Sequence, residues 1–141
     1  MAIRTGTAIW KGNLKTGHGK MNLESGTFEG NYSFSSRFED GKGTNPEELI
    51  GAAHAGCFSM ALSHGLAEAG YIPDEISTVA HVKLEKDEDG FKITKIILNT
   101  KGKVADISKE DFLKYAEEAK AGCPVSRALK AIDIELNAKL I

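Results

Sequence analysis

Cysteine, proline and tryptophan are scarce in this chain: its 141 residues include two cysteines, three prolines and one tryptophan. Neither a CxxC nor an HxxxH pair occurs, and a zinc site needs about four ligands, so no zinc site is predicted. Two cysteines in a reducing compartment are usually free, buried thiols. This inert role is the alternative against which any reactive role for the two thiols must be weighed.

Long apolar runs and an excess of one charge are also absent. The first six residues contain no apolar segment, so we expect no secretory leader and a cytoplasmic location. The uncharged run Ile50–Leu66 would span about 26 Å as a helix, but its Gly, Ala, Ser and His content does not predict a membrane span. The formal net charge is −2, which gives no reason to expect nucleic acid or an anionic membrane as partner. The length predicts one domain, residues 1–141.

One helix stands out near the middle of the chain. Asn45 can cap it, Pro46 fits its first position, and Glu48 completes the spacing of a capping box. Between residues 50 and 66 no side chain is charged, and small residues lie all around the helix. A helix without a polar face is expected to be buried on all sides. Cys57 lies in the middle of it.

The remaining elements follow from turn residues and from the spacing of apolar residues. They are strands at 2–11, 21–23 and 27–34, a loop at 35–44, the central helix to about 69, strands at 76–84 and 91–101, helices at 109–120 and 124–130, and a strand at 132–140. Hairpins and alternation indicate antiparallel sheets, so the order βββ-α-ββ-α-α-β predicts an α+β fold.

The apolar central helix also bears on oligomeric state. A one-sided sheet in a chain of this size cannot easily cover a helix that is apolar all round, whereas two such helices in a dimer could cover each other. The alternative is a monomer whose sheet curls around the helix. We favour the dimer.

The two cysteines have different expected environments. Cys123 precedes Pro124 and so caps a short helix, where free amides can favour a thiolate. Cys57 lies about three turns into its helix, and burial there would raise its pKa. A reactive Cys57 therefore needs a cation. Arg37, just before the helix, is the local candidate, and Arg127 is the competitor.

Two histidines accompany Cys57 on the helix, His54 and His64. Either could act as a general base, but buried, hydrogen-bonded core histidines are the favoured interpretation. A non-enzymatic alternative also stays open at this point. In it, an apolar cleft binds a hydrophobic small molecule or a metal, and both thiols are inert.

Two segments resemble a known family. They are RFEDGKGTNPEELIGAAHAGCFSMAL at 37–62 and AKAGCPVS at 119–126. Both closely resemble the osmotically inducible protein C family (OsmC), and the first is more similar to the OsmC branch than to the sister organic-hydroperoxide-resistance branch (Ohr). The element order and length match as well, so the resemblance covers essentially the whole chain.

The resemblance implies a thiol peroxidase that reduces organic hydroperoxides in oxidative or osmotic stress defence. It implies that Cys57 is the peroxidatic cysteine and Cys123 the resolving one, that Arg37 activates the thiolate, and that Glu47 pairs with Arg37. The implied fold is an intertwined homodimer with sheets wrapped around long central helices and two active sites near the subunit interface. No metal or bound organic cofactor is implied. The implied reductants are dithiols, notably lipoyl groups on proteins.

Glu47 raises a geometric difficulty. On one straight helix it lies about 15 Å from Cys57 and roughly 80° around the axis. Three solutions are open: Arg37 bridges the gap, the helix breaks near Gly51, or Glu47 serves the partner's site. Bridging by Arg37, helped by a break at Gly51, is the preferred solution, and Glu48 is assigned to capping.

Overall fold

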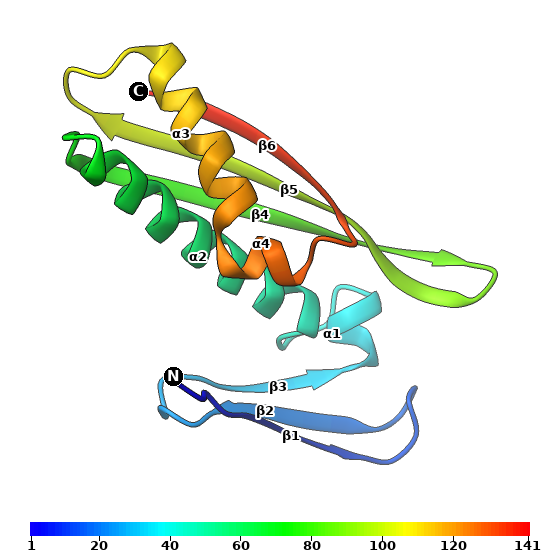
Figure 1. The fold of residues 1–141 in the computed structure, drawn as a ribbon. Coiled ribbons are helices and arrows are strands. Elements are labelled where there is room, and N and C mark those ends of the chain that lie inside the picture. Colours follow the sequence, from blue (N-terminus) through cyan, green and yellow to red (C-terminus); the bar gives the residue numbers. More distant parts are fainter. The chain divides into compact units, whose positions relative to one another are not determined.

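The computed structural model describes all 141 residues (Figure 1). The contacts divide the chain into two compact units, Met1–Leu49 and Ile50–Ile141. The boundary between the units falls inside the long helix α2, Pro46–Glu68. None of the helices combines the length and the hydropathy that a membrane-spanning segment needs.

The first unit is built on a three-stranded antiparallel sheet. Its strands are β1 (Gly6–Lys11), β2 (His18–Leu23) and β3 (Glu29–Ser33), in the order β1-β2-β3. The rings of Trp10 and Tyr32 pack 5.2 Å apart across the sheet. Gly19 lies between them, where a Cβ atom would approach both rings to within 3 Å. The sheet leads directly into α1 (Phe34–Phe38).

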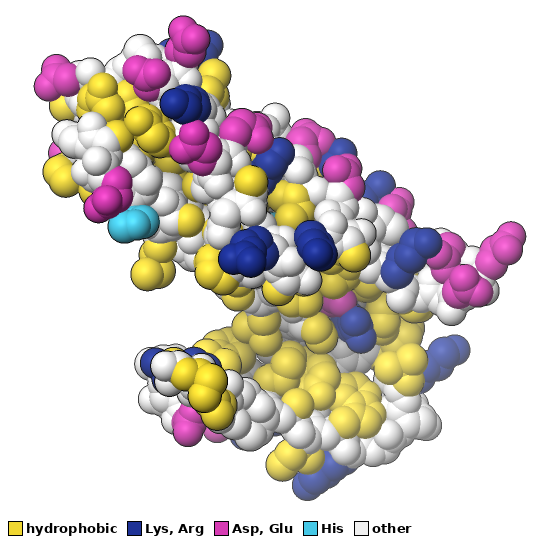
Figure 2. Space-filling view, in the orientation of Figure 1, with side chains coloured by type: hydrophobic (Ala, Val, Ile, Leu, Met, Phe, Trp, Pro, Cys, Tyr) yellow, Lys and Arg dark blue, Asp and Glu magenta, His cyan; other side chains and the backbone are white.

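The second unit is a three-stranded sheet with helices on one face. The strands are β4 (Pro73–Asp87), β5 (Gly90–Val104) and β6 (Asp133–Leu140), in the order β4-β5-β6. The main part of α2 and α3 (Lys109–Gly122) lie on the same face of this sheet, and α4 (Pro124–Ala128) follows α3 (Figure 1). The fully buried core side chains come from α2, β5, α3 and the start of α4: Phe58, Leu62, Leu66, Ile96, Leu98, Phe112, Ala116 and Cys123. Acidic side chains gather at the tip of the β4–β5 hairpin, around residues 87–89 (Figure 2).

The predicted α+β class is confirmed, with two corrections to its elements. First, α1 lies where the sequence predicted the end of a strand and a loop. It forms because Ser33 and Ser36 make a reciprocal capping box. Second, β6 pairs parallel to β5, from Lys95 opposite Asp133 to Gly102 opposite Leu140, so this sheet is mixed and not purely antiparallel. The alternation of β6 still places its apolar side chains toward the core.

The long helix α2 begins and ends as predicted. Asn45 caps it, and Gly70 adopts a φ of 91° beyond its end, where the Tyr71 amide donates to the Leu66 carbonyl at 2.9 Å. All-round burial, however, is not found within one chain. One face is buried, including His54 and Phe58, whereas Gly56, Met60 and His64 are exposed, and the surface of Met60 is 76% exposed. Hydrophobic side chains are visible along this part of the surface (Figure 2).

Candidate active site

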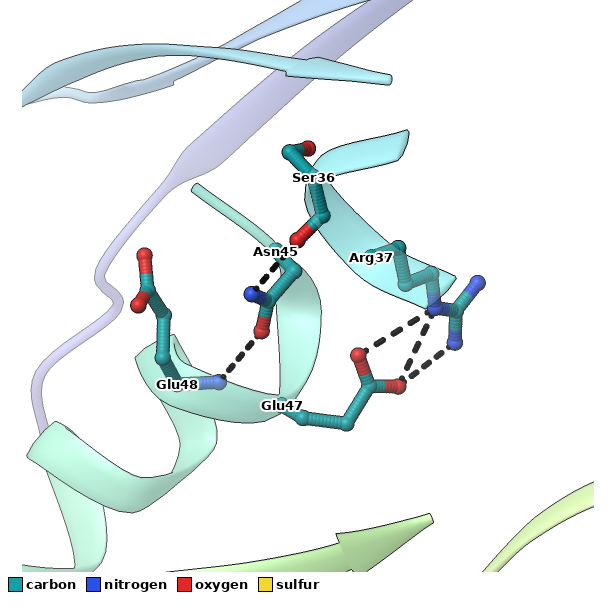
Figure 3. Close-up of polar contacts among 5 residues, drawn as sticks. All are labelled: Ser36, Arg37, Asn45, Glu47 and Glu48. Atoms are coloured by element: carbon teal, nitrogen blue, oxygen red, sulfur yellow. Dashed lines mark hydrogen bonds and ion pairs between the residues drawn. The ribbon is translucent and has the colours of Figure 1, made fainter. Parts of the chain in front are cut away.

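Arg37 and Glu47 form a forked ion pair within the first unit (Figure 3). Arg37 Nε donates to both carboxylate oxygens at 3.2 Å, and Nη2 donates to Oε1 at 2.6 Å. The Glu47 side chain is only 10% exposed, and that of Arg37 is 34% exposed. A planar fork of this kind fixes the orientation of the guanidinium as well as its position.

The pair is held by hydrogen bonds that tie α1 to the first turn of α2. Asn45 Oδ1 accepts from the Glu48 amide at 2.8 Å, and Asn45 Nδ2 donates to the Ser36 carbonyl at 3.1 Å (Figure 3). Ser36 Oγ donates to the Thr44 carbonyl at 2.7 Å. The Glu48 carboxylate accepts from Thr44 Oγ1, so Glu48 serves the helix start and Glu47 pairs with Arg37, as predicted.

One edge of the Arg37 guanidinium is open. Its Nη1 takes no part in the ion pair and points away from Glu47 (Figure 3). The guanidinium carbon also lies 5.2 Å from the centre of the Phe38 ring. The arrangement therefore presents a fixed cation with a donor edge that can bind a further anion or oxygen.

Cys57 and Cys123 meet in the second unit, and both are free thiols. Cys123 is completely buried, whereas Cys57 is half-buried. Both line one cavity of about 710 Å³ formed by α2, α3 and the start of α4. Its other lining residues are Met60, Ala61, His64, Gly65, Tyr115, Glu118, Ala119, Gly122 and Pro124. Two thiols thus lie together at a largely apolar cavity.

The second unit by itself does not activate Cys57. Burial raises the pKa of the Cys57 thiol, a hydrogen bond from the Val125 amide opposes this, and the neighbouring Cys123 raises that pKa further. The Val125 amide was not predicted as a partner for Cys57, because Val125 is distant from it in sequence. The predicted need for a cation to favour the Cys57 thiolate is consistent with this raised pKa.

Cys123 has a different set of partners. As predicted, it caps α4: its Sγ accepts from the Ser126 amide at 3.3 Å. Its Sγ also lies 3.2 Å from Ser126 Oγ, which in turn lies 2.7 Å from Nε2 of His54. His54 is completely buried, and burial lowers its pKa. His54 is therefore the buried, hydrogen-bonded histidine that was predicted, whereas the same prediction is wrong for His64, which is exposed at the cavity.

The predicted site residues form two groups. Arg37 pairs with Glu47 in the first unit, and Cys57 meets Cys123 in the second. The competitor Arg127 lines a different cavity, together with Lys120 and Lys130. The predicted helix break near Gly51 is wrong, because α2 is continuous from Pro46 to Glu68. No group of three or more His, Cys, Asp or Glu side chains is placed to hold a metal ion.

Comparisons with known proteins place the chain in a family. The family model described as OsmC-like protein matches residues 39–137. Peroxiredoxin OsmC of Escherichia coli (strain K12) is 53% identical over 129 residues, covering 91% of this chain and 90% of the relative. The organic hydroperoxide resistance protein OhrB of Bacillus subtilis is 35% identical over 109 residues, covering 74% of this chain and 76% of the relative.

Solved structures agree with this placement. The crystal structure of Bacillus subtilis OhrB matches with a TM-score of 0.72 and 25% identity, covering 97% of this chain and 98% of that one. An OsmC-like protein of unknown function from Vibrio cholerae has the same fold, with a TM-score of 0.77 at 16% identity, and covers 98% and 99% of the two chains. From the family model, the relatives and the shared fold together, this chain belongs to the OsmC-like protein family.

Proposed function

We propose that this protein is a thiol-dependent peroxidase that reduces organic hydroperoxides to alcohols. The observation that carries the proposal is the meeting of Cys57 and Cys123 at one largely apolar cavity. Two thiols so placed can pass through a sulfenic acid to a disulfide. The printed names of the relatives, a peroxiredoxin and organic hydroperoxide resistance proteins, agree with this chemistry.

In the first half-reaction the Cys57 thiolate attacks the outer oxygen of ROOH. The O–O bond breaks, the alkoxide takes a proton and leaves as ROH, and Cys57 becomes a sulfenic acid. Met60, Ala61 and Tyr115 line the cavity and suit an alkyl or lipid-derived R group.

In the second half-reaction Cys123 attacks the Cys57 sulfur. The S–O bond breaks, hydroxide takes a proton and leaves as water, and a Cys57–Cys123 disulfide forms. The disulfide protects Cys57 from further oxidation. A dithiol, such as a lipoyl group on a protein, then reopens the bridge by exchange and supplies the two electrons that the hydroperoxide consumed.

We assign the activation of Cys57 to the Arg37–Glu47 pair. A guanidinium stays protonated at any physiological pH and can hold both a thiolate and a peroxide oxygen. The open Nη1 edge supplies the donors for this role, and the Glu47 fork keeps that edge in one orientation.

We further propose that two chains form an intertwined homodimer whose α2 helices contact each other. The exposed face of α2 supports this, because it carries small residues and Met60 beside Cys57 and no charged side chain between residues 50 and 66. Light scattering at micromolar concentration is expected to give twice the chain mass of 15.2 kDa. A mass of one chain under these conditions contradicts the dimer.

A thiol count tests the peroxidase directly. One equivalent of an alkyl hydroperoxide added to the reduced protein is expected to remove both free thiols and leave an intramolecular disulfide, seen by thiol titration and mass spectrometry. Cys123→Ser, the matched control, should lose its single thiol to a sulfenic acid, perform one round of oxidation and fail to recycle. Two unchanged thiols in the wild-type protein would instead support a non-enzymatic binding protein with inert cysteines.

A further inference from the structure

A chain of buried polar groups ends at Cys123, and the chemistry described above leaves it without a role. It runs from His54 on α2 through Ser126 on α4 to the Cys123 sulfur, with contacts of 2.7 Å and 3.2 Å. His54 is 0% exposed and Ser126 is 4% exposed. The second ring nitrogen of His54, Nδ1, is buried and has no hydrogen-bond partner.

The unpaired Nδ1 indicates which nitrogen of His54 carries the proton. Because burial lowers the pKa of His54, the ring is neutral and holds one proton. A proton on Nδ1 would leave a buried N–H donor without an acceptor, which native proteins rarely tolerate. The proton therefore lies on Nε2, and His54 donates to Ser126 Oγ.

The direction of the His54 hydrogen bond determines where the hydroxyl proton of Ser126 can point. Because Ser126 Oγ accepts from His54, its own proton is available for the Cys123 sulfur 3.2 Å away. In the thiol form, Cys123 donates its S–H to Ser126 Oγ at 3.2 Å. In the thiolate form the sulfur has no proton to donate, so this contact reverses, and the sulfur accepts from both the hydroxyl and the amide of Ser126, the latter at 3.3 Å.

We propose that Ser126 and His54 stabilise the thiolate of the resolving cysteine, Cys123. Ser126 is the catalytic residue, since it touches the reacting sulfur, and His54 is a positioning residue that acts through Ser126. The inference rests on the proposed function and adds a cause for the second half-reaction. When Cys57 has become a neutral sulfenic acid, no neighbouring thiolate opposes ionisation of Cys123, and the Ser126 donors favour the anion at the moment when it must attack.

The other ionisable groups near this site are unchanged in the variants below. Cys57, His64 and Glu118 line the same cavity, and Lys120, Arg127 and Lys130 line the neighbouring cavity that Ser126 also touches. Ser126→Ala removes the hydroxyl and keeps the amide. In a Cys57→Ser background, which isolates Cys123, Ser126→Ala is expected to lower the thiolate fraction of Cys123 about tenfold where little of it is ionised, measured by thiolate absorbance.

The rate of disulfide formation supplies the second measurement. With Cys57 present and one equivalent of alkyl hydroperoxide, Ser126→Ala should slow this step by about threefold at a pH where little of Cys123 is thiolate. The reason is that about tenfold less thiolate is partly offset by the greater nucleophilicity of a more basic thiolate. At a pH high enough to ionise the thiol fully in both proteins, the variant should equal or exceed the wild type. Oxidation of Cys57 should keep its rate, and Ser126→Thr, which retains the hydroxyl, should restore the wild-type profile.

His54 has its own matched pair of variants. His54→Gln places an amide donor near the position of Nε2 and should behave like wild type, whereas His54→Met, of similar length, should shift the profile in the same direction as Ser126→Ala. An unchanged Cys123 thiolate absorbance in Ser126→Ala overturns the inference, and so does a slowing that is equal at every pH. Equal behaviour of His54→Gln and His54→Met overturns the role of His54. Failure of the proposed function is distinct, because wild-type protein would then lose no thiols to hydroperoxide while the thiolate absorbance of Cys123 could still be measured.

Discussion

Cys57→Ser is expected to abolish hydroperoxide turnover, lowering the rate of a dithiol-dependent assay by at least about 10³-fold. The serine hydroxyl remains protonated in the half-buried position of Cys57 and is a far weaker nucleophile than a thiolate. Consumption of an alkyl hydroperoxide in the presence of a dithiol is the measurement. A broad loss of folding is not expected, because serine is close to cysteine in size.

Cys123→Ser separates the roles of the two thiols. It should oxidise at Cys57 at a rate near that of wild type and then stop, since no second thiol can form the disulfide. Because Cys123 raises the pKa of Cys57, its removal should also make Cys57 oxidise at a somewhat lower pH. Full multiple turnover in Cys57→Ser would show that another group is the peroxidatic nucleophile and would contradict the mechanism.

Arg37→Met carries the second large effect, a loss of about 10²-fold or more in the rate of Cys57 oxidation near neutral pH. Without the cation, the burial that raises the Cys57 pKa is unopposed except by the Val125 amide. The Cys57 pKa should therefore rise, and the deficit should narrow as the pH rises and the thiolate forms without help. Initial rates of Cys57 oxidation across a pH series measure both effects.

Arg37→Lys and Arg127→Met are the controls. Lysine keeps the charge but cannot hold both oxygens of Glu47 in a fork, so it should recover only part of the rate. Arg127 lines another cavity, and its replacement should leave the rate unchanged. If Arg127→Met lost the rate and Arg37→Met kept it, the assignment of the activating cation would be reversed.

A feature could be predicted from the sequence when the residues that cause it lie close together in the chain. The ends of α2 were predictable because Asn45 and Gly70 act within a few residues of themselves. The face of β6 was predictable from alternation, but its direction was not, because alternation is the same for parallel and antiparallel pairing. The short helix α1 was not predicted, because five residues are too few to show a helical period. One domain and a cytoplasmic location stay predictions.

The same distinction applies to the site. Arg37 was a candidate from its place just before α2, Glu47 was identified through the family resemblance, and the ion pair between them is confirmed. The contact between His54 and Ser126 joins residues 72 positions apart, and neither residue shows a local pattern that predicts the other. The contact between the Val125 amide and Cys57 depends on where the fold places the backbone, so the side chain at position 125 could not predict it.

The unequal burial of the two cysteines sets the order of events during recycling. Both sulfurs line the cavity, but Cys123 has no exposed surface, whereas Cys57 is half-buried. In the proposed cycle an incoming dithiol therefore attacks the Cys57 sulfur, so the mixed disulfide forms on Cys57 and Cys123 leaves as the thiolate. A thiolate that is well stabilised leaves faster. Because the Cys123 sulfur is buried, the dithiol reductant and the hydroperoxide both react at the same atom, the Cys57 sulfur.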